Sequence, residues 1–452
     1  MSRALAAGQT RGTARTNQAR TPTTVEPIFT RSVLPNGLRI VTQPIPLGRS
    51  VSVGLFVGVG SRHEDDAHAG LSHLLEHLVF KGTRGFPDAG ALSETIEGVG
   101  GSVNASTDRE LTVYSAKVPR QAWRRALEVV AELCLRPLLR RRDLAAEKPV
   151  IVDEIRMYID SPADHIFTLF DELLFGAHPL GREIAGSPGS VRRATADLVR
   201  SHWEAWYRPP HLVLAVAGPV EHEAVVEIAR GWFSDETHEP PTPIGRPRTQ
   251  PPTPTAPGTV KVAHRRLGQA NLLLGMPGVA RDDPDRWALD LLGAVLGDGM
   301  SSRLFLELRE RRSLAYDIST FGSMYADCGT FGINAGFDPA QANAIVRAIL
   351  EQLERVAQEP VLETELERAR AYTRGRLELR MEESGAVVAW LGTGESLLPR
   401  ILSVEEVVEQ LAAVSTEDLL RVAQRYARPE LARLAVLGPF RGSRRFERLL
   451  PG

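Results

Sequence analysis

Leu214-Ala215-Val216-Ala217-Gly218-Pro219 returns later in the chain as Leu434-Ala435-Val436-Leu437-Gly438-Pro439. Two other features return with nearly the same shift in numbering. Thr195-Ala196-Asp197-Leu198 returns as Thr416-Glu417-Asp418-Leu419, and Tyr207 corresponds to Tyr426. A constant shift that spans almost half of the chain indicates two related halves, because the repeats of a solenoid are only about 20–50 residues long.

A proline-rich segment separates the two halves. Residues 240–257 contain eight prolines, which favour an extended, semi-rigid chain that cannot build a core. We therefore expect an N-terminal extension at 1–26, a first domain at 27–239, a linker at 240–258, and a second domain at 259–452.

Each half mixes the patterns of strands and helices. Asn36-Gly37 is a hairpin signal between short strands at 31–34 and 38–42. Further strand patterns lie at 51–59, 103–105 and 111–118, and helical periodicity lies at 69–82, 120–135, 150–158 and 162–175. In the second half a helix is expected to begin at Asp283-Pro284, since proline fits the first helical position. These patterns predict an α+β fold of two homologous domains, each with an antiparallel-rich sheet flanked by helices.

The composition excludes several classes of protein. The chain has 452 residues, of which 43% are hydrophobic and 24% are charged, with a net charge of −2. We therefore expect no nucleic-acid partner and no attraction to an anionic membrane surface. No apolar run approaches the roughly 18 residues that a membrane-spanning helix needs. Two cysteines, Cys134 and Cys328, exclude a disulfide framework and fit a reducing compartment.

The N-terminal segment up to Val25 is basic and lacks an apolar core. Four arginines precede the first acidic residue, Glu26, and no apolar run of a secretory signal is present. Leu5 is the only large aliphatic residue before Val25, so the apolar face of an organelle transit peptide is also missing. We interpret the segment as a disordered extension. Arginine greatly outnumbers lysine in the chain, which is typical of a GC-rich bacterial genome, and we expect a cytoplasmic bacterial protein.

The clearest chemical signal is His73-Leu74-Leu75-Glu76-His77. On a helix with about 100° per residue, one face holds Leu71, Leu74, Leu75, Leu78 and Val79, and the opposite face holds His73, Glu76, His77 and Phe80. Histidines four positions apart can bind one Zn²⁺, and Glu76 is placed to accept a proton from a metal-bound water. The alternative is a polar surface with two unrelated histidines, which the amphipathic context disfavours.

A catalytic zinc site needs a third protein ligand and an open position. Glu154 is the candidate, because it shares a helical face with Val150, Ile151 and Ile155. A carboxylate on an apolar stripe is costly to bury unless it is paired or bound to metal. The alternative is a solvated helix carboxylate, and the apolar neighbours argue against it.

His-x-x-Glu-His is the inverzincin motif, and the chain resembles the insulinase/pitrilysin superfamily of zinc peptidases, in the branch that includes mitochondrial processing peptidase and has chains of this length. The resemblance extends from about position 27 to position 440 and rests on Gly60-Ser61-Arg62 and on the stretch from Gly70 to Thr83. It implies one Zn²⁺ per chain, bound by His73, His77 and Glu154, with Glu76 as the catalytic base. The spacing of the family's third ligand from the second histidine leads to Glu154 here.

The resemblance also implies that Glu147, two helical turns before Glu154, supports a ligand. Pro149 departs from the uninterrupted helix that this role requires. Proline fits only the first helical turn, so the helix is expected to begin or kink at Pro149. This expectation leaves open the direction in which the Glu147 side chain points, and it does not change the predicted ligand role of Glu154.

Substrate contacts are implied as well. The family's Asn-Ala pair matches Asn104-Ala105, on a strand whose free edge would pair with an extended peptide. From the residues alone, an ordinary glycine-rich hairpin is the alternative. Arg309 and Tyr316 match an Arg and a Tyr of active members, which can grip a substrate carbonyl and donate to a developing oxyanion. Without the resemblance they would be interpreted as surface residues. Gly293 occupies the position equivalent to His73, so the second half has no second zinc motif.

We therefore expect a zinc metalloendopeptidase that hydrolyses short or unfolded peptides in a closed chamber. The alternatives are a non-catalytic peptide-binding or scaffold subunit of a processing-peptidase-like complex, and a metal-storage or sensor protein, which would not need Glu76. In the long single-chain members the Arg/Tyr pair and the zinc lie in opposite bodies. The resemblance thus implies a homodimer, or a heterodimer with a sister subunit, in which Arg309 and Tyr316 serve the zinc of the partner chain.

Overall fold

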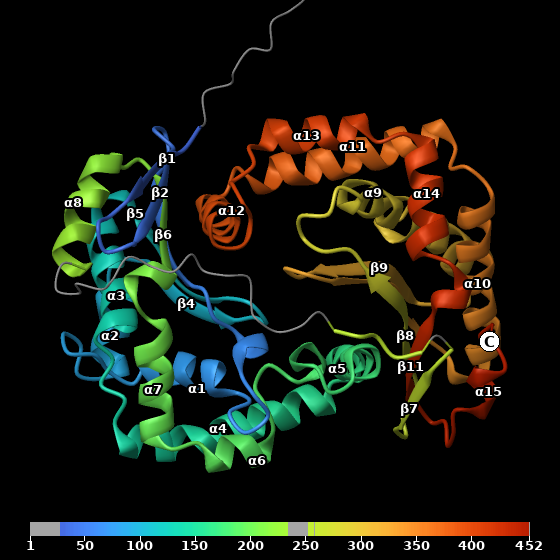
Figure 1. Ribbon diagram of the computed structural model, residues 1–452, viewed down its shortest axis with the longest axis horizontal. Helices are drawn as coiled ribbons and strands as arrows, with labels where there is room; N and C mark the ends of the chain where they lie inside the picture. Colours follow the sequence, from blue (N-terminus) through green and yellow to red (C-terminus); the bar gives the residue numbers. More distant parts are fainter. Residues whose placement is uncertain (1–27, 234–251, 257, 452) are drawn as a thin grey trace, which may run out of the picture.

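The computed structural model describes residues 28–233, 252–256 and 258–451. The extension expected at 1–26 and most of the linker expected at 240–258 lie outside the described residues. The described chain forms two halves, each with one sheet and its own set of helices (Figure 1). This confirms the predicted α+β fold.

The sheet of the first half has six strands in the order β1-β2-β6-β3-β5-β4. Its strands are β1 (Thr30–Val33), β2 (Arg39–Pro44), β3 (Ser50–Val57), β4 (Ser102–Thr107), β5 (Thr112–Pro119) and β6 (Leu212–Gly218). The pair β2–β6 is parallel, and the other neighbouring pairs are antiparallel. Strand β4 pairs with β5 alone among the described strands and therefore forms one edge of this sheet.

The sheet of the second half repeats this plan with five strands in the order β7-β11-β8-β10-β9. Its strands are β7 (Val260–His264), β8 (Ala270–Gly278), β9 (Asp317–Met324), β10 (Gly329–Phe337) and β11 (Arg433–Gly438). The pair β7–β11 is parallel, at the position that β2–β6 holds in the first sheet, and the remaining pairs are antiparallel.

Fifteen α-helices lie in the described ranges. They are α1 (Leu71–Val79), α2 (Ala89–Glu97), α3 (Trp123–Leu135), α4 (Arg141–Asp160), α5 (Pro162–Phe175), α6 (Pro188–Arg193), α7 (Ala196–Trp206), α8 (His222–Phe233), α9 (Arg286–Gly297), α10 (Ala342–Gln358), α11 (Glu363–Arg380), α12 (Ser384–Leu397), α13 (Val404–Ala413), α14 (Thr416–Tyr426) and α15 (Arg444–Glu447). Helices α7 and α14 have the same length of 11 residues and occupy equivalent positions in the two halves, as the sequence repeat predicts. None of these helices is long and apolar enough to cross a membrane.

Helices α5 and α12 cross between the halves. Helix α5 of the first half packs on β8 and β11 of the second sheet, while α12 of the second half packs on β3 and β6 of the first sheet (Figure 1). Two equivalent glycines make room for them. A Cβ at Gly275 would overlap the ring of Phe170, and one at Gly54 would lie 2.7 Å from Val388. Each half therefore completes the apolar core of the other.

The helix expected to begin at Asp283-Pro284 begins later, at Arg286. The side chain of Asp283 accepts a hydrogen bond from the backbone N–H of Asp285 over 2.8 Å. This local bond holds the residues around Pro284 in a turn, so the helix starts after the turn.

Candidate metal centre

Helix α1 has the two faces that its sequence predicts. Leu74 and Leu75 are 1% and 0% exposed and pack into the core of the first half, with the other three apolar residues of that face. Gly70 precedes the helix with φ of 92°, and a Cβ there would overlap the carbonyl oxygen of Ala185. The N-terminus of α1 is thus fixed by close backbone packing.

A buried carboxylate also fixes the N-terminus of α1. Glu64 accepts hydrogen bonds from the backbone N–H groups of Gly70, over 2.7 Å, and Ser72, over 2.6 Å. Burial raises the pKa of Glu64 to about 7, although these hydrogen bonds and Arg182 lower it. The carboxylate satisfies N–H groups that have no partner inside the helix.

The polar face of α1 meets α4 at three side chains. His73 Nε2 lies 3.7 Å from Glu154 Oε1, and His77 Nε2 lies 3.3 Å from Glu154 Oε2. The ligand atoms of the three residues all lie within 4.8 Å of one another. The structure therefore brings together the three residues that the sequence predicts as metal ligands.

These three residues fit a zinc ion. Two ligands at about 2.0–2.1 Å from Zn²⁺, with a tetrahedral angle between them, are roughly 3.4 Å apart, and the two nitrogen–oxygen distances lie close to that value. Two imidazoles and one carboxylate are also the donor set of several catalytic zinc sites. Burial, followed by the neighbouring His77, lowers the pKa of His73 to about 4, so this imidazole is neutral at pH 7, as a metal ligand must be.

The expectation that α4 begins or kinks at Pro149 is wrong about where the helix begins. It begins earlier, at Arg141, and contains Pro149 in its interior. An interior proline removes one backbone hydrogen bond and costs about 3 kcal/mol. Burial of Leu144, Ile151 and Ile155 on the same helix offsets that cost, since each such side chain contributes roughly 1.5–3 kcal/mol.

Because α4 is continuous, Glu147 faces the metal site. Its Oε2 lies 3.1 Å from His77 Nδ1, and its Oε1 lies 2.5 Å from the ammonium of Lys81. A carboxylate on the second nitrogen of a ligating histidine fixes the ring and the tautomer that presents Nε2 to the metal. Glu147 is buried, with 5% of its surface exposed, so Lys81 balances a charge that would otherwise be costly.

A residue of the first sheet fixes the carboxylate of Glu76. The hydroxyl of Thr107, the last residue of β4, donates a hydrogen bond to Glu76 Oε2 over 2.5 Å. Burial raises the pKa of Glu76, and the hydrogen bond from Thr107 acts in the opposite direction. The carboxylate thus has a fixed orientation beside the three ligands and a greater proton affinity than a solvated glutamate.

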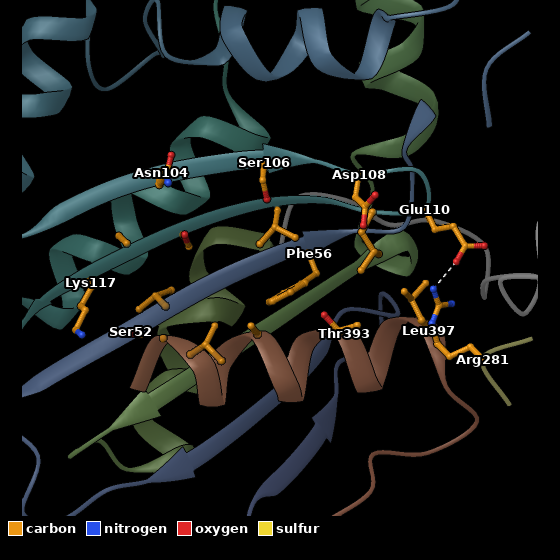
Figure 2. A pocket seen from close by; sticks show the side chains of 18 of the residues that line it. Ser52, Phe56, Asn104, Ser106, Asp108, Glu110, Lys117, Arg281, Thr393 and Leu397 are labelled. Carbon is orange, nitrogen blue, oxygen red and sulfur yellow. Dashed lines mark hydrogen bonds and ion pairs between the residues drawn. The ribbon is translucent and has the colours of Figure 1, made fainter. Parts of the chain in front are cut away.

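Strand β4 presents a free edge next to this centre. Asn104 is exposed, and its Oδ1 accepts a hydrogen bond from the N–H of Ala105 over 2.9 Å. Asn104 and Ser106 line a cavity of about 560 Å³, which Thr393 and Leu397 of α12 close from the other side (Figure 2). An edge strand bordered by a cavity can accommodate an extended peptide.

Arg309 and Tyr316 lie in the second half of the chain, shortly before β9, and Figure 1 shows β9 and α1 in different halves. The guanidinium of Arg309, in the π-helical segment η5 (Phe305–Arg311), lies 4.7 Å above the ring of Phe305. Tyr316 precedes β9, is 44% exposed, and packs its ring against Gly336. No hydrogen bond, ion pair or ring contact among the described residues joins this pair to the three ligands.

Sequence reasoning assigned no role to Thr107, Lys81 or Glu64. Thr107 shares one face of β4 with Val103 and Ala105, so strand periodicity could have placed it on the side of α1. Lys81 follows His77 by one helical turn. Glu64 lies outside α1, and no local pattern links it to the helix that it caps.

Comparison with known proteins gives consistent matches. The model of the insulinase family (peptidase family M16) matches residues 39–188, and that of the M16 peptidase inactive domain matches residues 193–372. A protein of Streptomyces coelicolor, described as an uncharacterized zinc protease, is 39% identical over 415 residues, which cover 91% of this chain and 90% of the relative. A Bacillus subtilis protein with the same description is 32% identical over 405 residues, covering 89% and 97%. In fold, a protease from Helicobacter pylori matches with a TM-score of 0.82 at 24% identity, over 90% of this chain and 99% of that chain.

Proposed function

This chain belongs to the insulinase family of peptidases, M16, and we propose that it is a zinc-dependent endopeptidase that hydrolyses short or unfolded peptides. The observation that carries the proposal is the convergence of His73, His77 and Glu154 within 4.8 Å, with Glu76 held beside them by Thr107. A metal-storage site would need the three ligands but not an oriented, buried carboxylate next to them.

The roles of the residues follow from their positions. Zn²⁺ bound by the three ligands would lower the pKa of a coordinated water to about 7 and polarise a peptide carbonyl. Glu76 would accept a proton from the attacking water and pass it to the leaving amine, for which its raised pKa is suited. Glu147 would keep the ring of His77 in the ligating orientation.

The free edge of β4 would hold the substrate. A peptide added as a further strand would pair its backbone with Asn104 and Ala105 and direct alternate side chains to the cavity beside β4. This mode of binding needs an extended chain, which supports short or unfolded peptides as substrates.

We further propose that Arg309 and Tyr316 act on the site of a partner chain, in a homodimer or with a sister subunit. Their separation from α1 within one chain supports this, as does the exposure of Tyr316. Burial, followed by Asp317, raises the pKa of Tyr316, so its hydroxyl stays protonated and able to donate to an oxyanion.

The test combines metal content with cleavage of a random peptide library. Purified protein should hold about one zinc per chain and cleave peptides until a chelator removes the metal. Glu76→Gln should retain zinc and lose about 10²–10⁴-fold in kcat, because the base is removed and the ligands remain. His73→Ala and Glu154→Ala should lose zinc. Near-wild-type turnover of Glu76→Gln would refute the proposal, and peptide binding without cleavage by wild-type protein would favour a non-catalytic subunit.

A further inference from the structure

The turn between β4 and β5 carries a buried charge cluster that joins the two halves. Glu110, in this turn, and Arg62 belong to the first half, while Arg281 and Asp327 belong to the second. Glu110 is 4% exposed, and Arg62 is completely buried. Buried ions are costly to desolvate, and apolar replacements are often neutral or stabilising, so stability alone does not account for such a cluster.

Glu110 is the hub of this cluster. Its Oε1 accepts hydrogen bonds from Arg62 Nη1 over 2.9 Å and from the backbone N–H of Ala326 over 3.0 Å. Its Oε2 accepts one from Arg281 Nη2 over 2.6 Å, and the same nitrogen donates to the carbonyl oxygen of Met324 over 2.7 Å (Figure 2). Arg62 also pairs with Asp327. Two of the three groups that bind Glu110 therefore come from the second half.

The segment Gly60-Ser61-Arg62 holds the backbone of the same turn. Ser61 N–H donates to the carbonyl oxygen of Asp108 over 3.1 Å, and Arg62 N–H donates to that of Arg109 over 2.9 Å. A Cβ at Gly60 would overlap the carbonyl oxygen of Asp108. These contacts explain why the segment needs glycine at its first position and arginine at its third.

Arg109 anchors the turn a second time. Its Nη1 donates to the carbonyl oxygen of Arg182 over 2.7 Å, and Nη2 pairs with Asp171 of α5, the helix that packs on the second sheet. The turn is therefore fixed on both sides of the boundary between the halves. Directional ionic contacts fix the turn in one position relative to the second half, whereas an apolar contact at the same place would allow the two surfaces to shift against each other.

We infer that Glu110 and Arg281 are positioning residues, through which the second half of the chain fixes the β4 edge strand and Thr107 relative to Glu76. Thr107 lies in the same turn region as Glu110, at the end of β4, and is the contact between β4 and Glu76. The part of the inference that concerns peptide binding and catalysis rests on the proposed function. Its structural part, that the cluster orders β4, does not depend on any activity.

A second ion pair between the halves provides a matched control. Arg31 of β1 makes two hydrogen bonds to Glu395 of α12, over 2.9 and 2.8 Å. Strand β1 is the edge of the first sheet opposite to β4. Loss of this pair weakens the contact between the halves without touching the β4–β5 turn, so it separates general docking from local positioning.

The experiment compares Arg281→Gln, Arg281→Lys and Glu395→Gln by hydrogen exchange and by peptide kinetics. In Arg281→Gln the amides of residues 102–107 should exchange about tenfold faster, while those of α14 keep the wild-type rate. Glu395→Gln should leave β4 unchanged, and Arg281→Lys should restore most of the protection. With zinc content unchanged, KM for peptides should rise about fivefold or more in Arg281→Gln alone, because the edge strand that pairs with the peptide is less ordered.

The outcomes separate the possible failures. Equal amide exchange rates of β4 in Arg281→Gln and Glu395→Gln would overturn the inference. A fall in turnover of Arg281→Gln at unchanged KM would overturn it as well, because that result indicates only a smaller fraction of folded protein. If wild-type protein shows no chelator-sensitive cleavage, the proposed function fails while the exchange measurement still decides the structural part. If Arg281→Gln does not fold, the charge-balanced variant Glu110→Met/Arg281→Met, which keeps the Arg62–Asp327 pair, takes its place with the same expected loosening of β4.

Discussion

Thr107 donates its hydroxyl hydrogen to Glu76 over 2.5 Å, and the two residues belong to different elements of the first half. The bond joins the edge strand β4 to the helix α1, which carries the two histidines of the candidate metal centre. It links the surface that would hold a peptide to the group that would move its protons. A shift of β4 is therefore transmitted directly to the carboxylate of Glu76.

Replacement of Thr107 tests this link. Thr107→Val keeps the shape of the side chain and removes the donor, so the carboxylate of Glu76 loses a hydrogen bond worth about 1.5–3 kcal/mol to a charged group. We expect kcat to fall by about 10- to 100-fold with no loss of zinc. Thr107→Ser retains the hydroxyl and should stay within a few-fold of wild type. Equal loss in both variants would show that packing matters and the hydrogen bond does not.

Glu147 is predicted to control zinc affinity. Glu147→Gln removes the negative charge that faces His77 Nδ1 and Lys81, which weakens the orientation and the basicity of the ligand. Loss of such a partner typically costs about 10- to 100-fold in metal affinity. Competition with a chromogenic chelator measures the change. Asp153→Asn, an exposed carboxylate on the same helix, is the control and should bind zinc like wild type.

The assembly is tested by complementation. Glu76→Gln protein and Tyr316→Phe protein should each be weak alone, because each lacks one part of every site. When they are mixed, activity should recover to about a quarter of the wild-type value, because free exchange makes about half of the dimers mixed and each mixed dimer has one intact site of two. Native mass spectrometry confirms exchange. Absence of recovery despite exchange would place Tyr316 in the site of its own chain or outside any site.

Glu64 predicts a pH dependence of stability. Its pKa in the folded protein is about 7, against an ordinary value of 4.5, so the folded state binds the proton more tightly. The contribution of Glu64 to the free energy of unfolding therefore decreases as pH rises from about 4.5 to 7, by up to about 3 kcal/mol. Urea unfolding at pH 5 and pH 7.5, with chelator present, measures the free energy of unfolding of wild type and of Glu64→Gln. Between pH 5 and pH 7.5 this free energy should fall more in wild type than in Glu64→Gln. A difference that is the same at both pH values would contradict this.

Local periodicity in the sequence was sufficient for much of the fold and of the site. The internal repeat predicted two equivalent sheets, and α7 and α14 lie at equivalent positions of that repeat. The alternation of faces around His73 and His77 predicted the buried side of α1 and the opposite side that carries both histidines, because helical geometry alone decides which side chains share a face. Glu154 could be named because a family spacing supplied a long-range relation.

Tertiary structure decided the features that depend on residues distant in sequence. Helix α4 continues through Pro149 because packing of its apolar face outweighs the local cost, and only this continuity aims Glu147 at His77. The exchange of α5 and α12 between the halves and the ion pair of Glu110 with Arg281 join segments from opposite halves of the chain. Periodicity records which face of an element is apolar, but the partner of that face is selected by the packing of the whole chain.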